Sequence, residues 1–244
     1  MKSTTKIAFA AIAFAGMTAV ASADTLDMKF TGTARGTNVK ITQDTQTNNV
    51  FAGQLKHTIQ NALGIYSPLN GEQITFCSDV YQSVTSTYKA FDIVGLSVIP
   101  NGVPMGSAKA DAIWNMYQAQ GSSALASTAS NELAAAFQIA VWEIVSDFDA
   151  GVGLSSLNVN GGAFKAKKTN GDALNGALAT NLASLFSIAV GGFQAEPSLS
   201  LIGLRHSTAQ DQIVAYRGAI PAPGAGMLAG LGLLCMGRRN RAVK

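Results

Sequence analysis

The sequence predicts an α+β domain in which a β sandwich or barrel carries an inserted helical subdomain of about three helices. Two observations support this prediction. Near both ends of the central region, apolar and polar residues alternate with period two, which is typical of half-buried strands. Between these parts, apolar residues recur at three- and four-residue steps, which is typical of amphipathic helices. The chain has 244 residues, enough for one substantial core once its two ends are set aside.

The strand pattern is present in four stretches. It begins after residue 24, pauses at Asn- and Gly-rich turns, and returns in the last part of the central region. The predicted strand-forming stretches are residues 25–59, 72–84, 88–99 and 191–219.

The helical pattern occupies the middle of the chain. The predicted helices cover residues 107–120, 131–148 and 171–190. Ser107 is a plausible N-cap of the first helix, and Ser130 or Asn131 could cap the second. Residues 154–164 are rich in Asn and Gly, and they indicate a loop with short strand-like pieces.

The N-terminal end, residues 1–23, has the pattern of a secretory signal. Lys2 and Lys6 make it positively charged, an apolar stretch follows to Val20, and residues 21–23 are the small residues expected before a cleavage site. Because the apolar stretch is too short for a comfortable membrane span, we expect export followed by removal of this segment.

The C-terminal end, residues 220–244, has three parts: a Pro-rich break, an apolar Gly-rich run over residues 225–237, and a basic cluster. A spanning helix needs about 20 apolar residues, and this run is shorter. The basic end would stay on the cytoplasmic side by the positive-inside rule. The break comprises Pro221, Ala222, Pro223 and Gly224, and the basic cluster contains Arg238, Arg239 and Arg241.

This three-part end resembles the PEP-CTERM sorting signal of Gram-negative bacteria, although Ala222 stands where the commonest pattern has Glu. The resemblance implies processing by an exosortase-type enzyme during a transient stay of the short apolar helix in the inner membrane. It also implies a final location in the cell envelope or at the extracellular surface. A plain tail anchor of a secreted protein is the alternative.

The domain between the two ends, residues 24–219, differs from the whole chain in charge and in cysteine count. Six of the 17 Lys and Arg residues lie in the ends, whereas all 14 Asp and Glu residues lie between them, which leaves 11 against 14 and a net charge of −3. Nucleic acid is therefore not an expected partner, because binding it requires a basic face. With Cys235 in the sorting segment, Cys77 is the one cysteine of the mature domain, so no disulfide can form within it.

Cys77 and Gln138 are the two residues that need a chemical explanation. Cys77 follows Phe76 at the end of a strand-like stretch, and Gln138 lies in an otherwise apolar helical run with Trp142 one turn later. A buried glutamine amide must find hydrogen-bond partners, and the ordinary interpretation is a neighbouring backbone group. For Cys77, the alternatives are an inert buried thiol, an intermolecular disulfide or another covalent bond.

The segment Phe76-Cys77, followed much later by Phe137-Gln138-x-Ala-Val-Trp142, resembles the thioester domains of bacterial surface adhesins over roughly residues 74–147. Phe137 departs from the adhesin motif, which usually has Thr or Pro there. The resemblance implies that the Cys77 thiolate attacks the Gln138 carboxamide, that ammonia leaves, and that an internal thioester forms.

Thioester chemistry explains the apolar surroundings of the motif. The aromatic residues Phe76, Phe137 and Trp142 would keep water away from the bond. The acyl group could then be transferred to an amine on a protein or polysaccharide surface, in a single covalent event without turnover. The alternative is a non-reactive structural or binding protein of the extracellular matrix or biofilm.

Other sites are not predicted. His57 and His206 are the only histidines, and they lie far apart without carboxylate-rich neighbours, so we expect no metal site. No phosphate-binding loop or Ser/His/Asp set is present, so we expect neither an enzyme nor a cofactor. Residues 147–151 indicate a helix end rather than a calcium loop. The basic residues Lys165, Lys167 and Lys168 indicate a solvated loop.

Overall fold

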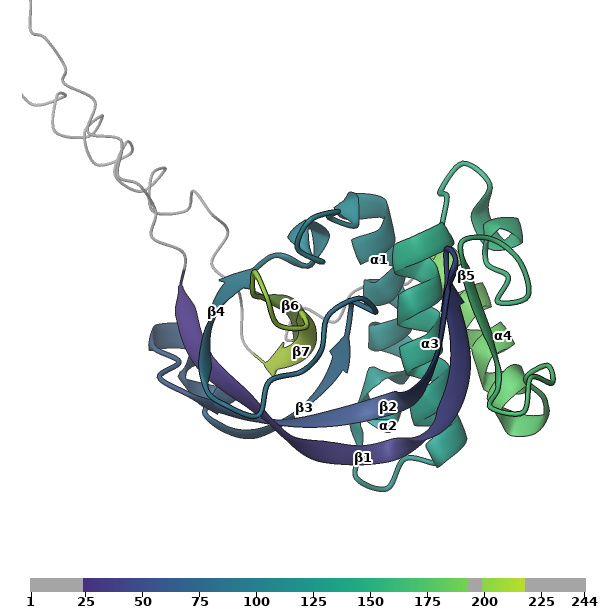
Figure 1. Cartoon of the computed structure of the whole chain (residues 1–244). Coiled ribbons are helices and arrows are strands. Elements are labelled where there is room, and N and C mark those ends of the chain that lie inside the picture. Colours follow the sequence, from purple (N-terminus) through teal and green to yellow (C-terminus); the bar gives the residue numbers. More distant parts are fainter. Residues whose placement is uncertain (1–23, 193–198, 218–244) are drawn as a thin grey trace, which may run out of the picture.

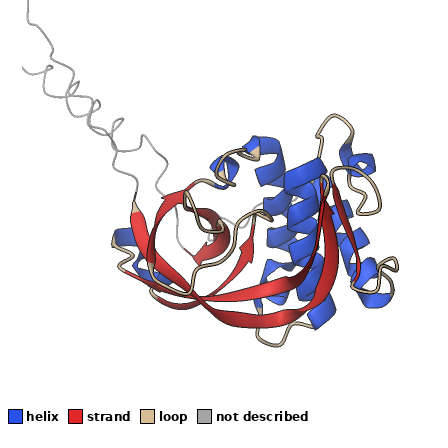
Figure 2. Cartoon of the chain, in the orientation of Figure 1, coloured by secondary structure: helices blue, strands red, loops and turns tan. Residues whose placement is uncertain are grey.

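The computed structural model describes residues 24–192 and 199–217. These residues form seven strands and four α-helices, which confirms the predicted α+β class (Figure 2). The predicted secretory signal of residues 1–23 and the sorting signal of residues 220–244, with its 221–224 break and arginine cluster, lie outside the described residues. None of the helices in the described ranges has both the length and the apolar character that crossing a membrane requires.

Six of the strands close a barrel, which decides between the two predicted β architectures. Around the barrel the order is β1, β2, β3, β7, β6, β4, and β4 then pairs with β1 again; every pairing is antiparallel. The seventh strand, β5, lies beside the second half of β1. The strands are β1 Thr25–Gln43, β2 Gln46–Gln60, β3 Gly71–Cys77, β4 Lys89–Val94, β5 Phe164–Lys168, β6 Leu199–Arg205 and β7 Gln212–Arg217.

The long hairpin of β1 and β2 belongs both to the barrel and to the sheet that packs against the helices. The first half of β1 pairs with β4 in the barrel, and its second half pairs with β5 against the helices (Figure 1). Between the halves, Gly36 faces Gly53 next to an irregularity in the register. A Cβ atom at Gly36 would lie 2.3 Å from the Ala52 carbonyl oxygen, and one at Gly53 would lie 2.2 Å from the Arg35 carbonyl oxygen. The two glycines therefore permit a close backbone approach where the hairpin passes from one layer to the other.

The helices follow the prediction with shifted boundaries. Ser130 caps the second predicted helix, because its side chain accepts a hydrogen bond from Leu133 N. The prediction for Ser107 was wrong: the first helix already begins at Gly106, without a side-chain cap. It continues through a π-helical turn into a short helix. The helices are α1 Gly106–Met116, the π turn Tyr117–Gly121, α2 Ser122–Leu125, α3 Asn131–Asp147 and α4 Gly176–Val190; 3₁₀ turns cover Gly64–Leu69, Leu96–Val98 and Gly153–Ser156.

The stretch before α4 was misassigned in two respects. Lys165, Lys167 and Lys168 do not form a solvated loop but belong to strand β5, whose alternate residues Phe164 and Ala166 are fully buried. The chain then turns back, and Ala173 bridges to Lys167. Residues 171–175 form the segment that runs back along β5, so α4 begins at 176 rather than at 171.

Two apolar cores result from this arrangement. One fills the barrel and contains Leu26, Phe91, Ile202 and Leu204 among others. The larger one lies between the β1–β2–β5 layer and the helices, with α3 between this layer and α4 (Figure 1). Every residue of α3 from 134 to 144 is buried, because the helix has neighbours on both sides. Gln138 is therefore buried among apolar residues, as predicted.

Candidate functional site

Cys77 and Gln138, which are 61 positions apart in the sequence, lie in direct contact. Cys77 ends β3, which α3 packs against, and both side chains are 1% exposed. The Cys77 backbone N–H donates to Gln138 Oε1 at 2.9 Å, and Gln138 Nε2 donates to the Cys77 carbonyl oxygen at 2.8 Å. The carboxamide thus satisfies a donor and an acceptor of one buried backbone unit, which is what a buried amide requires.

The Cys77 sulfur is held between an indole and a carbonyl group. Trp142 Nε1 donates to Sγ at 3.0 Å, and Sγ donates to the Asp79 carbonyl oxygen at 3.2 Å. Trp142 lies one turn after Gln138 on α3, so one helix face supplies both contacts. Burial raises the pKa of the Cys77 thiol to about 12, although the Trp142 hydrogen bond acts in the opposite direction. The thiol is therefore neutral at neutral pH.

Aromatic residues lie around this contact. The Phe76 and Phe137 ring centroids are 4.7 Å apart, and Trp142 lies 6.1 Å from Phe164. All four side chains belong to the same buried cluster as Cys77. The three aromatic residues of the predicted cover are therefore buried near the site, and Phe164 joins them. Sequence reasoning missed Phe164, although the alternation of residues 164–168 was a signal for an inward-facing position.

A network of polar side chains extends from the strands of the barrel to the Asp79 carbonyl oxygen, which also accepts from the Cys77 thiol. Thr75 Oγ1 donates to Gln212 Oε1 at 2.8 Å and lies 2.9 Å from His57 Nδ1. Gln212 donates to Gln210, whose Nε2 donates to the Asp79 carbonyl oxygen at 2.8 Å. Burial lowers the pKa of His57 to about 4, so its ring is neutral at neutral pH. These buried side chains fix the carbonyl oxygen that accepts the thiol proton, and none of them was predicted.

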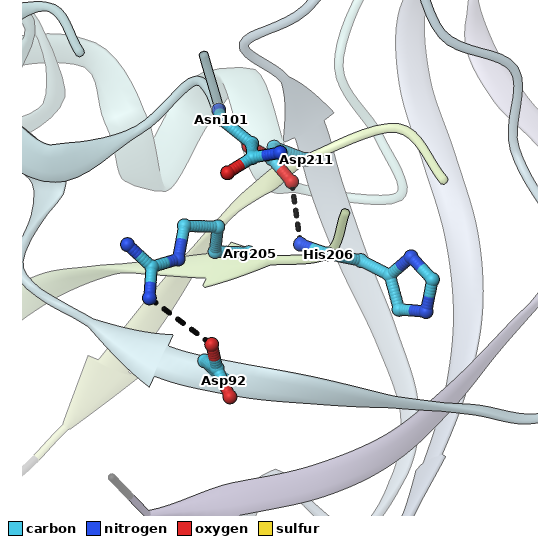
Figure 3. Close-up of polar contacts among 5 residues, drawn as sticks. All are labelled: Asp92, Asn101, Arg205, His206 and Asp211. Atoms are coloured by element: carbon cyan, nitrogen blue, oxygen red, sulfur yellow. Dashed lines mark hydrogen bonds and ion pairs between the residues drawn. The ribbon is translucent and has the colours of Figure 1, made fainter. Parts of the chain in front are cut away.

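Asp211 lies just before β7 and holds the chain next to the end of β3, the strand that ends at Cys77. Its carboxylate accepts from Asn101 N at 2.5 Å and from His206 N at 2.7 Å, next to an Arg205–Asp92 ion pair of 3.1 Å (Figure 3). Its carbonyl oxygen accepts from the backbone N–H of the residue that follows the cysteine. Burial raises the pKa of Asp211, and the two N–H donors oppose this shift. Asp211 thus joins three chain segments, and its role is positional.

The histidines and the 147–151 segment, for which no metal site was expected, have structural contacts. Within residues 24–192 and 199–217, no three or more His, Cys, Asp or Glu side chains group as a metal site would require. His206 Nδ1 accepts from two backbone N–H groups of its own loop. The Asp147 carboxylate accepts from Ala163 N and Phe164 N, so it ends α3 by holding the start of β5.

Glu143 is a fully buried carboxyl group on α3, next to Trp142 in the sequence. Its Oε1 accepts from Asn158 N at 2.6 Å, while Oε2 has no hydrogen-bond partner among the described residues. Burial raises the pKa of Glu143 from 4.5 to about 8. The folded protein therefore holds this proton more tightly than the unfolded chain, and stability falls as the pH rises through this window.

The Glu143→Gln variant is expected to lose this pH dependence. The wild-type unfolding free energy should fall by roughly 2–4 kcal/mol more than that of the variant between pH 4.5 and pH 8. Urea denaturation at a series of pH values measures both. Glu132→Gln, at an exposed glutamate of the same helix, should keep the wild-type slope. Equal slopes for wild type and Glu143→Gln would contradict the assignment.

Comparison with known proteins gives one similarity. Neither a protein-family model nor a curated protein matches the chain. Among solved structures, the chain is similar to the N-terminal thioester domain of a surface protein from Clostridium perfringens, with 12% sequence identity and a TM-score of 0.36. The alignment covers 73% of this chain and 98% of that chain.

Proposed function

We propose that this chain is an exported cell-surface or matrix protein whose domain forms an internal thioester between Cys77 and Gln138. The thioester would attach the protein covalently to an amine-bearing protein or polysaccharide surface. One observation supports this most: the Gln138 carboxamide is held against Cys77, the only cysteine among the described residues, by two buried hydrogen bonds. Export and sorting by an exosortase-type enzyme rest on the sequence of the two ends.

Bond formation needs no oxidant and no cofactor. The Cys77 sulfur attacks Cδ of Gln138, the C–N bond of the carboxamide breaks, and ammonia leaves with the thiol proton. A thiolate is the better nucleophile, and the N–H donor of Trp142 stabilises negative charge on the sulfur as it develops. For this step the carboxamide has to turn from the Cys77 backbone toward Sγ.

The buried aromatic side chains around the site would then protect the thioester from water. Phe76, Phe137 and Trp142 are at most 4% exposed, and their exclusion of water slows hydrolysis of the thioester. When a partner amine attacks Cδ, an amide forms, the C–S bond breaks, and the Cys77 thiol is restored. The protein is consumed in one covalent event, so it acts as an attachment module and not as an enzyme.

A second candidate is a non-reactive structural or binding protein of the extracellular matrix or biofilm. Two observations favour it: the hydrogen bonds of Gln138 are already satisfied by the Cys77 backbone, and burial holds the thiol in its neutral form. The intact mass of the purified protein separates the two candidates, because thioester formation removes one ammonia and packing removes nothing.

A further inference from the structure

A small cavity of about 40 Å³ lies one residue away from the sulfur of Cys77. Asp79 and Trp142 line it, and the Asp79 carbonyl oxygen and Trp142 Nε1 contact Sγ at 3.2 and 3.0 Å. Since a water-sized molecule needs roughly 10–15 Å³, the cavity can take ammonia or the tip of an unbranched primary amine.

Asp79 is the one charged side chain among the nine residues that line this cavity. It is 5% exposed, and its Oδ1 accepts from Tyr81 N at 2.7 Å. Burial raises the pKa of Asp79, while N–H donors of Tyr81 and Gln82 oppose the shift. Tyr81 also lines the cavity and is 61% exposed, and its hydroxyl donates to Asp44 Oδ2 at 2.5 Å. The cavity is therefore lined by an exposed tyrosine and by the buried acid whose backbone carbonyl oxygen accepts from the Cys77 thiol.

We propose that this cavity is the port through which ammonia leaves and a primary amine enters, and that the Asp79 carboxylate receives the amine as an ammonium ion and takes its proton. The inference rests on the proposed thioester. An amine of lysine type is protonated at neutral pH and cannot attack in that form. A buried carboxylate in the cavity wall attracts the cation and serves as its general base. The substrate class is thus an unhindered alkylammonium group.

The ammonium ion gives one proton to Asp79, and the neutral amine nitrogen attacks Cδ of Gln138. The Cδ–Sγ bond breaks as the amide forms, and the second nitrogen-bound proton goes to Sγ, which restores the Cys77 thiol. Asp79 returns its proton to solvent. One ammonium ion and one thioester give one amide, one thiol and one proton.

The Asp79→Asn variant of the full chain tests this role. Asparagine keeps the oxygen that accepts from Tyr81 N, so the turn is retained, but it removes the charge and the base. Two probes are compared by mass spectrometry near neutral pH: methylamine, which is almost fully protonated, and hydroxylamine, which is largely neutral. We expect the variant to form the thioester, to incorporate methylamine roughly 100-fold more slowly, and to react with hydroxylamine at nearly the wild-type rate.

Two further variants complete the experiment. Asp79→Glu restores the carboxylate and should recover part of the methylamine rate. Asp44→Asn removes a charge next to Tyr81 but outside the cavity lining, and should leave both rates unchanged.

The outcomes distinguish the two proposals. Equal loss with both probes, no loss with either, or failure of Asp79→Asn to form the thioester would overturn the role of Asp79 and leave the attachment function in place. A wild-type protein without the mass deficit would overturn the attachment function and this inference together.

Discussion

Cys77→Ala is expected to keep the full mass calculated from its sequence and to incorporate no methylamine. The substitution removes the only thiol among the described residues, so no acyl group can be activated. Loss of the sulfur leaves Trp142 Nε1 without its acceptor, at a cost of about 1–3 kcal/mol, so the fold should persist. Mass spectrometry after incubation with methylamine, together with urea denaturation, measures both effects.

Gln138→Glu is the companion variant and should show the same loss. Glutamate keeps the shape and an acceptor oxygen, but it has no ammonia to release. Gln46→Glu, at an exposed glutamine, serves as the matched control and should behave as wild type. Methylamine incorporation by Cys77→Ala at the wild-type rate would place the reaction elsewhere in the chain.

Phe137→Ala is expected to lower the unfolding free energy by about 3–5 kcal/mol, because the side chain is 2% exposed and its removal leaves a cavity in the larger core. The centroids of the Phe137 and Phe76 rings are 4.7 Å apart, so the new cavity would lie beside the end of β3, next to Cys77. Water can then reach the site, and the thioester should hydrolyse with the gain of one water. Urea denaturation and the time course of the intact mass measure the two effects.

Leu63→Ala is the control for this substitution. Leu63 is 78% exposed, and its truncation should change stability by less than about 0.5 kcal/mol. A Phe137→Ala protein that is as stable as wild type would contradict the packing described here.

The contact between Cys77 and Gln138 could be predicted because the segments Phe76-Cys77 and Phe137-Gln138-x-Ala-Val-Trp142 resemble those of bacterial thioester domains. Each residue is also unusual in its own setting, since Cys77 is the one cysteine among the described residues and Gln138 lies in an otherwise apolar part of its helix. The α+β class followed equally from local periodicity, and the Ser130 cap followed from local side-chain chemistry. The fold class and the helix cap depend on neighbouring residues alone.

The surroundings of the site could not be predicted, because they depend on long-range pairing. Thr75 and Gln212 are 137 positions apart, and only the β3–β7 register brings them together. Barrel closure likewise depends on β1 pairing with both β2 and β4. Asp79 was given no role in the sequence analysis, because the cavity that it lines is completed by Trp142 from a helix far along the chain.

The intact mass of the purified, untreated protein tests the central claim most directly. Mass spectrometry under denaturing, non-reducing conditions should give a value below the mature sequence mass by one ammonia, with no thiol free to react with a thiol reagent. A value equal to the sequence mass, with one titratable thiol at Cys77, would contradict the thioester and leave Gln138 as a packing residue of α3.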